Sequence, residues 1–207
     1  MRIARWMVVA AGVATLTSLA CTTTTFQSTW RAPEAKPLQI QGAKVVGVFL
    51  SKSAAVRHKG EDAMARELTA RGAQGVPAYT ILTDDEAKDP EAAKAKLDSL
   101  GFAGAVVMRV VGRETDVHYA PAVWVGPRYH HFWGYWRWGW GSVWEPQYLA
   151  VDKVVKVETL VYSITQDELV WAGVSKTVDP RHVDDLVSDL AKAVADQLAK
   201  AGLLKKV

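Results

Sequence analysis

The side chains best suited to metal chemistry share one stretch in the second half of the chain. His118, His130 and His131 lie there together with Glu114 and Asp116, and imidazoles suit zinc, copper or nickel. Adjacent residues of an extended segment point to opposite faces. A single tetrahedral ion would therefore need a loop conformation that the sequence does not indicate. We expect no metal centre and no cofactor.

No set of residues has the spacing of a catalytic site. Neither a G-x-S-x-G nucleophile motif nor a Gly-rich phosphate loop is present. His182 stands beside Asp184 and Asp185, but carboxylates in the first turn of an expected helix favour its N-terminus. The acidic run at 84–86 is typical of a loop leading into a helix. We expect a protein without enzymatic activity.

Cys21 is the one residue with a specific predicted modification. Arg2 and Arg5 precede an apolar run that ends at Ala20, the pattern of a secretory signal over residues 1–20. The apolar run is shorter than the roughly 20 residues that span a membrane. Cys21, the only cysteine, stands at the cleavage point, where a bacterial lipoprotein carries its lipid. We expect a lipid there; cleavage by ordinary signal peptidase, leaving an unpaired thiol, is the alternative.

The charges of the mature chain nearly balance. Removing Arg2 and Arg5 from the 25 Lys and Arg leaves 23 against 22 Asp and Glu, a net charge of +1. This balance is not that of a nucleic-acid-binding protein. The length of the mature chain fits one domain with its own core.

An unusually aromatic stretch is the main candidate contact surface. Between Tyr119 and Tyr148 lie eleven of the nineteen Phe, Trp and Tyr residues, including six of the nine tryptophans. In an extended segment, Trp136, Trp138 and Trp140 would point to one face about 7 Å apart. An exposed patch of this kind marks an interaction site. The alternative is that the stretch folds over the sheet as a second small core.

We expect the indoles to meet a partner. A protein would use them as hot-spot anchors, a glycan such as peptidoglycan would stack on the rings, and a membrane would take Trp and Tyr at its headgroup level. A protein or assembly partner is the leading interpretation, and a module that binds cell-wall glycan is the alternative. The expected contact residues are Tyr129, Trp133, Trp136, Arg137, Trp138, Trp140 and Trp144.

Short strands and helices alternate along the rest of the chain. Residues 21–43 read as a tether, and residues 44–204 read as a single domain with an aromatic insert at 119–150. We expect strands over 44–51, 75–82 and 103–119, a hairpin over 151–178, and helices over 60–71, 90–100 and 180–204. Asp89 and Pro90 are a typical N-cap and first helical residue. The order β-α-β-α-β-(insert)-β-β-α predicts an α+β domain with one mixed sheet of about five strands and three helices.

Two segments resemble a known group of envelope proteins. "LGFAGAVVMRVVG" at 100–112 and "SITQDELVWAG" at 163–173 are similar to patterns in periplasmic lipoproteins of the curli-assembly and penicillin-binding-protein-activator type, which are related in fold to the amino-terminal domain of the Tol-system propeller protein. The resemblance implies a non-enzymatic protein of the bacterial envelope, and we expect it on the periplasmic face of the outer membrane. It transfers no functional residue, and the aromatic insert departs from the pattern.

Overall fold

The computed structural model describes residues 23–33, 40–112, 124–143, 154–178, 180 and 182–205. The predicted signal and Cys21 lie outside them, as does Trp144. The strands are β1 (Thr23–Arg31), β2 (Lys44–Leu50), β3 (Gln74–Pro77), β4 (Gly104–Gly112), β5 (Val154–Ser163) and β6 (Glu168–Val178). The helices are α1 (Ala54–Ala70), α2 (Asp84–Lys88), α3 (Pro90–Ser99), α4 (Pro127–His130), α5 (Phe132–Gly141) and α6 (Val183–Lys200), with a short 3-10 turn η1 (Ala78–Thr80).

All six described strands belong to one sheet, in the order β1-β6-β5-β4-β2-β3. β2 is parallel to both β3 and β4, whereas β4, β5, β6 and β1 are successively antiparallel. The prediction of an α+β domain with one mixed sheet is confirmed. The expected numbers of elements are wrong, because the described residues hold six strands and six α-helices rather than five and three.

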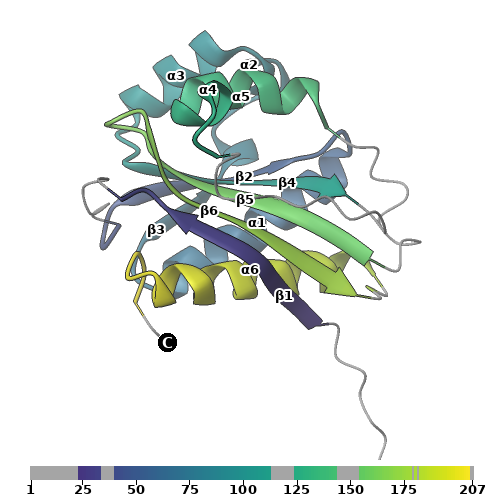
Figure 1. Ribbon diagram of the computed structural model, residues 1–207. Coiled ribbons are helices and arrows are strands. Elements are labelled where there is room, and N and C mark those ends of the chain that lie inside the picture. The colour runs from purple at the N-terminus through teal and green to yellow at the C-terminus, as the bar shows by residue number, and fades with distance from the viewer. Residues whose placement is uncertain are drawn as a thin grey trace, which may run out of the picture.

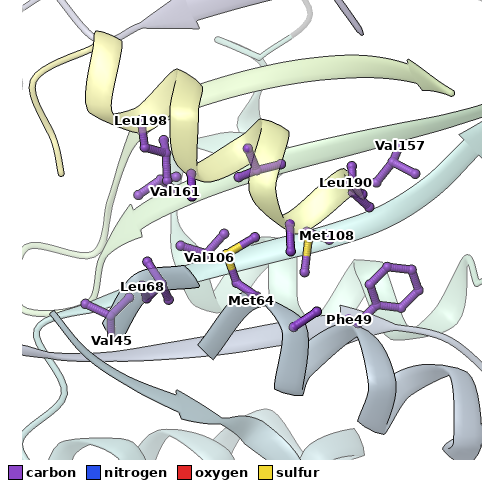
Figure 2. Packing of buried hydrophobic residues seen from close by; sticks show 14 of the residues in the cluster. Val45, Phe49, Met64, Leu68, Val106, Met108, Val157, Val161, Leu190 and Leu198 are labelled. Atoms are coloured by element: carbon purple, nitrogen blue, oxygen red, sulfur yellow. The ribbon is translucent and has the colours of Figure 1, made fainter. Parts of the chain in front are cut away.

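Helices cover both faces of the sheet (Figure 1). α1 and α6 lie on one face, and α2, α3, α4 and α5 lie on the other. Successive strand residues point to opposite faces, so Val45 and Phe49 join the cluster under α1 and α6 while Val46, Val48 and Leu50 join the other. Figure 2 shows the first cluster, in which side chains of α1 and α6 meet the strands. Because helices cover both faces of the sheet, a central strand needs apolar residues on both of its sides. β4 has such a continuous apolar run and is buried along its whole length.

The predicted tether is wrong for residues 23–31, which form the edge strand β1. β1 pairs with β6 from Thr23 opposite Val178 to Arg31 opposite Trp171, with a bulge between Phe26 and Ser28. A bulge inserts one extra residue, and Phe26 and Trp30 accordingly pack against clusters on opposite faces of the sheet. The Thr-rich segment is β-branched and carries two aromatic anchors, which favours a strand over a free linker.

Several predicted boundaries move when the packing is known. α1 begins at Ala54, six residues before the predicted start, with Ser53 as its N-cap. The predicted strand at 75–82 ends at Pro77 and continues as η1. α6 begins at Val183 with His182 as its N-cap, not at Pro180. No helix within the described ranges is long and apolar enough to cross a bilayer.

Other local predictions are confirmed. The Asp89 side chain accepts hydrogen bonds from the amides of Glu91 and Ala92, and Pro90 is the first residue of α3. Asp184 and Asp185 lie in the first turn of α6. The sequence also places Val183, Leu186, Val187, Leu190, Val194 and Leu198 on one apolar helical stripe. In α6 all of them are buried except Val183, which is half-buried.

A buried carboxylate ties α1 to the neighbouring elements. Glu61 is 1 % exposed and accepts hydrogen bonds from the amides of Phe49 in β2, at 3.3 Å, and Tyr79 in η1, at 2.7 Å. Burial raises the pKa of Glu61 from 4.5 to about 7, against the opposing effect of these two amides and Arg57. The folded domain therefore binds a proton here more tightly than the unfolded chain does.

This shift predicts a pH-dependent stability. Because the folded pKa is the higher one, the contribution of Glu61 is fully present below pH 4.5 and is lost as the pH rises to about 7. A shift of this size corresponds to roughly 3 kcal/mol. Chemical denaturation across this range should show the wild type losing free energy of unfolding relative to Glu61→Gln, which cannot ionise. Parallel curves for the two proteins would contradict the assignment.

Candidate functional site

Residues 124–143, called here the aromatic unit, form two helices rather than an extended ladder. α4 and α5 lie on the sheet face that also carries α2 and α3 (Figure 1). Helical geometry gathers Phe132, Tyr135, Trp136 and Gly139 on one stripe, and all four are buried. The sequence of α5 contains three glycines, each of which disfavours a helix. Packing on the sheet therefore holds α5, not its intrinsic propensity.

Gly139 lets α5 approach the sheet closely. A Cβ atom at this position would lie 2.6 Å from Cδ1 of Leu50 in β2, which is too close for any larger residue without a shift. The apolar spacing at 132, 135, 136 and 139 is a helical pattern. This spacing is the signal in the sequence that indicates a helix here.

The expectation of an exposed indole ladder is wrong. Trp136 is 1 % exposed and Tyr129 is 2 % exposed, so neither can meet a partner directly. Trp133, Trp138 and Trp140 are half-buried against the same cluster. The aromatic unit is thus largely the second core that the sequence left open as the alternative.

Arg137 alone among the described contact candidates is exposed. Its guanidinium lies 3.5 Å from the Glu91 carboxylate of α3, and both side chains are mostly in solvent. Such a surface pair contributes little to stability.

Trp136 anchors α5 to its neighbours. Its indole N–H donates to the carbonyl of Ala87 at the end of α2, at 2.9 Å. The ring of Phe132 lies 5.4 Å from that of Trp136 in an edge-on arrangement and 5.3 Å from that of Tyr162 in β5. These contacts join α2, α5 and the sheet through aromatic rings at favourable separations.

A buried ion pair fastens the aromatic unit to the middle of the sheet. Glu158 of β5 stands opposite Arg109 of β4, and the carboxylate lies 3.1 Å from the guanidinium with both side chains buried. The Tyr135 hydroxyl donates to Oε2 of Glu158 at 2.9 Å, and the Trp124 indole N–H donates to Oε1 at 3.1 Å. Both carboxylate oxygens are therefore paired, each by a residue of the aromatic unit.

The protonation states support this network. Burial lowers the pKa of Arg109, but Tyr135 and Glu158 beside it outweigh that effect and raise it above its ordinary value. Burial and the charge of Glu158 raise the pKa of Tyr135 well above its ordinary value. The Tyr135 hydroxyl thus remains a donor. The Arg109 guanidinium also lies 4.3 Å from the centre of the Trp138 ring, a favourable cation–π contact.

Sequence reasoning missed Arg109 and Glu158. The signal is charge within apolar strands: Arg109 in "GAVVMRVVG" of β4, and Glu158 together with Lys156 in "VVKVETLVYS" of β5. A charge in a buried strand needs a partner of opposite sign. We interpret the Arg109–Glu158 pair as a structural element and not as a functional site, because its polar atoms contact one another and the aromatic unit.

A groove of about 430 Å³ lies beside the aromatic unit. The end of β1 and the start of β6 form one side, and the residues at the start of the aromatic unit form the other. Its lining residues are Trp30, Ala32, Pro33, Trp124, Val125, His130, Glu168 and Leu169. We call it the Trp30–Trp124 groove. Trp30 packs against the core cluster on this face of the sheet. The sequence did not predict the concavity.

The two described insert histidines have separate surroundings. His130 lines the groove, whereas Nδ1 of His131 lies 3.2 Å from the carboxylate of Asp167. In the part of the chain that the structure describes, no three His, Cys, Asp or Glu residues are grouped to hold a metal ion. The other members of the cluster weighed above, residues 114, 116 and 118, lie outside that part.

No family model and no curated protein matches this chain. The solved structures similar to it include two PelC dodecamers from Paraburkholderia phytofirmans. One, a variant with a single substitution, has a TM-score of 0.43 and 16 % identity, covering 84 % of this chain and 96 % of that chain. The other has a TM-score of 0.44 and 13 % identity, covering 84 % and 95 %. A similarity this low supports no conclusion about function, so the function is argued from the residues of this chain.

The packing of Trp136 predicts a large effect of its removal. Trp136→Ala should lower the free energy of unfolding by about 3–5 kcal/mol, because it deletes a buried ring and leaves a cavity. Arg137→Ala, the matched control on the adjacent exposed position, should change it by no more than about 0.5 kcal/mol. Urea denaturation measures both. Similar small effects would mean that the ring is exposed after all.

Proposed function

We propose that the protein is a non-catalytic lipoprotein of the bacterial cell envelope that binds a protein or assembly partner. In this proposal a lipid on Cys21 anchors it to the periplasmic face of the outer membrane, and the partner occupies the Trp30–Trp124 groove. The signal pattern before Cys21 and the position of that cysteine support the anchor.

The composition of the groove is the observation that carries the binding proposal. Trp30 and Pro33 give it an apolar lining, backed by Trp124 and Leu169, which are themselves 1 % and 6 % exposed, and His130 and Glu168 supply polar groups. Val125 beside them is 53 % exposed. Apolar pockets with aromatic walls and a polar rim are where protein partners place their anchor residues.

The burial of α5 moves the expected contact away from the indole ladder. Trp136 and Tyr129 are buried, so they hold the aromatic unit in place and do not contact the partner themselves. Trp124 forms part of the groove and is fixed by its hydrogen bond to Glu158. Four other expected contact residues keep some exposure: Trp133, Trp138, Trp140 and Arg137. They would contact a partner only at the margin of a large interface.

A glycan of the cell wall is the alternative occupant. The groove volume of about 430 Å³ falls in the range of roughly 300–1,000 Å³ that is usual for small-molecule sites. An indole face and hydrogen-bonding groups such as His130 and Glu168 suit the two kinds of surface on a sugar ring. A protein partner remains the leading proposal because Val125, an exposed apolar side chain of the groove, suits an apolar anchor residue better than it suits a sugar.

The anchor is tested by replacing its attachment site. Cys21→Ser should abolish labelling by a fatty-acid probe and move the protein from the membrane to the soluble fraction, since no other thiol is present. Unchanged membrane retention in this variant, with no label in the wild type, would contradict a lipoprotein.

The groove is tested by placing a charge in it. Val125→Glu should preserve the fold, because the position is exposed, while a photo-crosslinker in the groove should no longer capture the partner that it captures in the parent protein. Leu100→Glu is the matched control: Leu100 is also an exposed large apolar residue, 37 % accessible, at the end of α3.

The two occupants give different results in the groove experiment. A protein that crosslinks in the parent and in Leu100→Glu, rebinds when purified and is lost in Val125→Glu supports the protein partner. Sedimentation with purified peptidoglycan that Val125→Glu abolishes would support the glycan instead. Equal binding by both variants in both assays would contradict the groove as the binding site.

A further inference from the structure

The start of β1 leaves almost no chain between the proposed lipid and the folded domain. Cys21 is separated from Thr23, the first residue of β1, by one residue. Two residue steps of extended chain span no more than about 7 Å. A lipid on Cys21 would therefore be held beside one particular end of the sheet.

β1 is fastened to the domain from its first residue onward. Thr23 stands opposite Val178 in the ladder with β6. The hydroxyl oxygens of Thr24 and Thr177 lie 2.8 Å apart, and the Phe26 ring meets the Trp171 ring edge-on at 5.8 Å. These contacts leave no flexible segment among the described residues that could let the domain turn freely about the anchor.

The same end of the sheet carries surface groups that suit a bilayer surface. Val178, which ends β6, is 42 % exposed, and Val154, which begins β5, stands opposite it. Lys59 of α1 pairs with Asp184 in the first turn of α6, and both side chains are half or more exposed. An exposed apolar residue among charged ones matches the boundary between headgroups and acyl chains.

We infer that this end of the sheet, formed by the start of β1, the end of β6 and the start of β5, rests on the lipid bilayer. The inference depends on the proposed lipid at Cys21 and adds an orientation to it. Figure 1 shows β1 entering at the end where the arrowhead of β6 lies. The bilayer thus contacts this one end of the sheet rather than an arbitrary face of the domain.

The orientation also places the Trp30–Trp124 groove. Trp30 follows Thr23 by seven residues along β1, which corresponds to roughly 23 Å at about 3.3 Å per residue. Glu168 and Leu169 of the groove begin β6, whereas Val178 ends it. The groove therefore lies at the end of the sheet away from the bilayer, where it is open to a partner in the periplasm.

The experiment measures which end of the domain is close to lipid. The acylated full chain, with Val178→Cys or Leu100→Cys, is labelled at the new thiol with a fluorophore and reconstituted in vesicles of phosphatidylethanolamine and phosphatidylglycerol that contain a headgroup quencher. The two positions are matched exposed apolar residues. Leu100 precedes Gly104, which pairs with Ser163 at the far end of the sheet. Quenching should be several-fold stronger at 178 than at 100.

A second variant tests whether the short connection between Cys21 and β1 causes the difference in quenching. Inserting about ten Gly and Ser residues after Thr22 supplies a flexible linker and should bring the two quenching values together. Equal quenching at both positions before the insertion, or stronger quenching at 100, would overturn the orientation while leaving the proposed function intact. Mass spectrometry of the same samples reports the lipid: an unmodified Cys21 would overturn the proposed function and the orientation with it.

Discussion

The buried carboxylate of Glu158 is the constraint on which the arrangement of this domain depends. A charge in the centre of a covered sheet is costly unless it is paired and fully hydrogen-bonded. Arg109 supplies the opposite charge from the next strand, and Tyr135 and Trp124 supply the remaining donors. Two of the three partners come from the aromatic unit, so that unit must lie on this face of the sheet.

The position of the Trp30–Trp124 groove, the proposed binding site, follows from the same constraint. Trp124 contributes to the groove and to the Glu158 network at once, while β1 supplies the opposite wall through Trp30. β1 also begins next to the proposed lipid site, so one strand would link the end of the sheet inferred to meet the bilayer to the groove. Stability, the proposed anchoring and the proposed recognition therefore share a few elements of the fold rather than separate regions.

Local signals predicted much of the fold. Apolar runs predicted β2, β4 and the β5–β6 hairpin, the Asp89-Pro90 pair predicted the start of α3, and the apolar stripe predicted the buried face of α6. β1 was not predicted because its Thr-rich composition also suits a linker, and only pairing with β6 distinguishes the two. α5 was not predicted because its sequence carries two competing signals. Its glycines and the tryptophans at 136, 138 and 140 also suit extended chain, while the spacing of Phe132, Tyr135 and Trp136 is helical, and packing against Leu50 and Tyr162 selects the helix. The site was less predictable still, because the groove combines three segments far apart in sequence.

The central claim is that the aromatic unit belongs to the core and holds the proposed binding groove in place. Amide hydrogen exchange of residues 132–141, compared with β5 in the same protein under native conditions, tests it most directly. The account predicts that the hydrogen-bonded amides of α5 are protected to a degree similar to those of β5, since both are held by the Glu158 network. Exchange of α5 at the rate of exposed chain, while β5 remains protected, would contradict it.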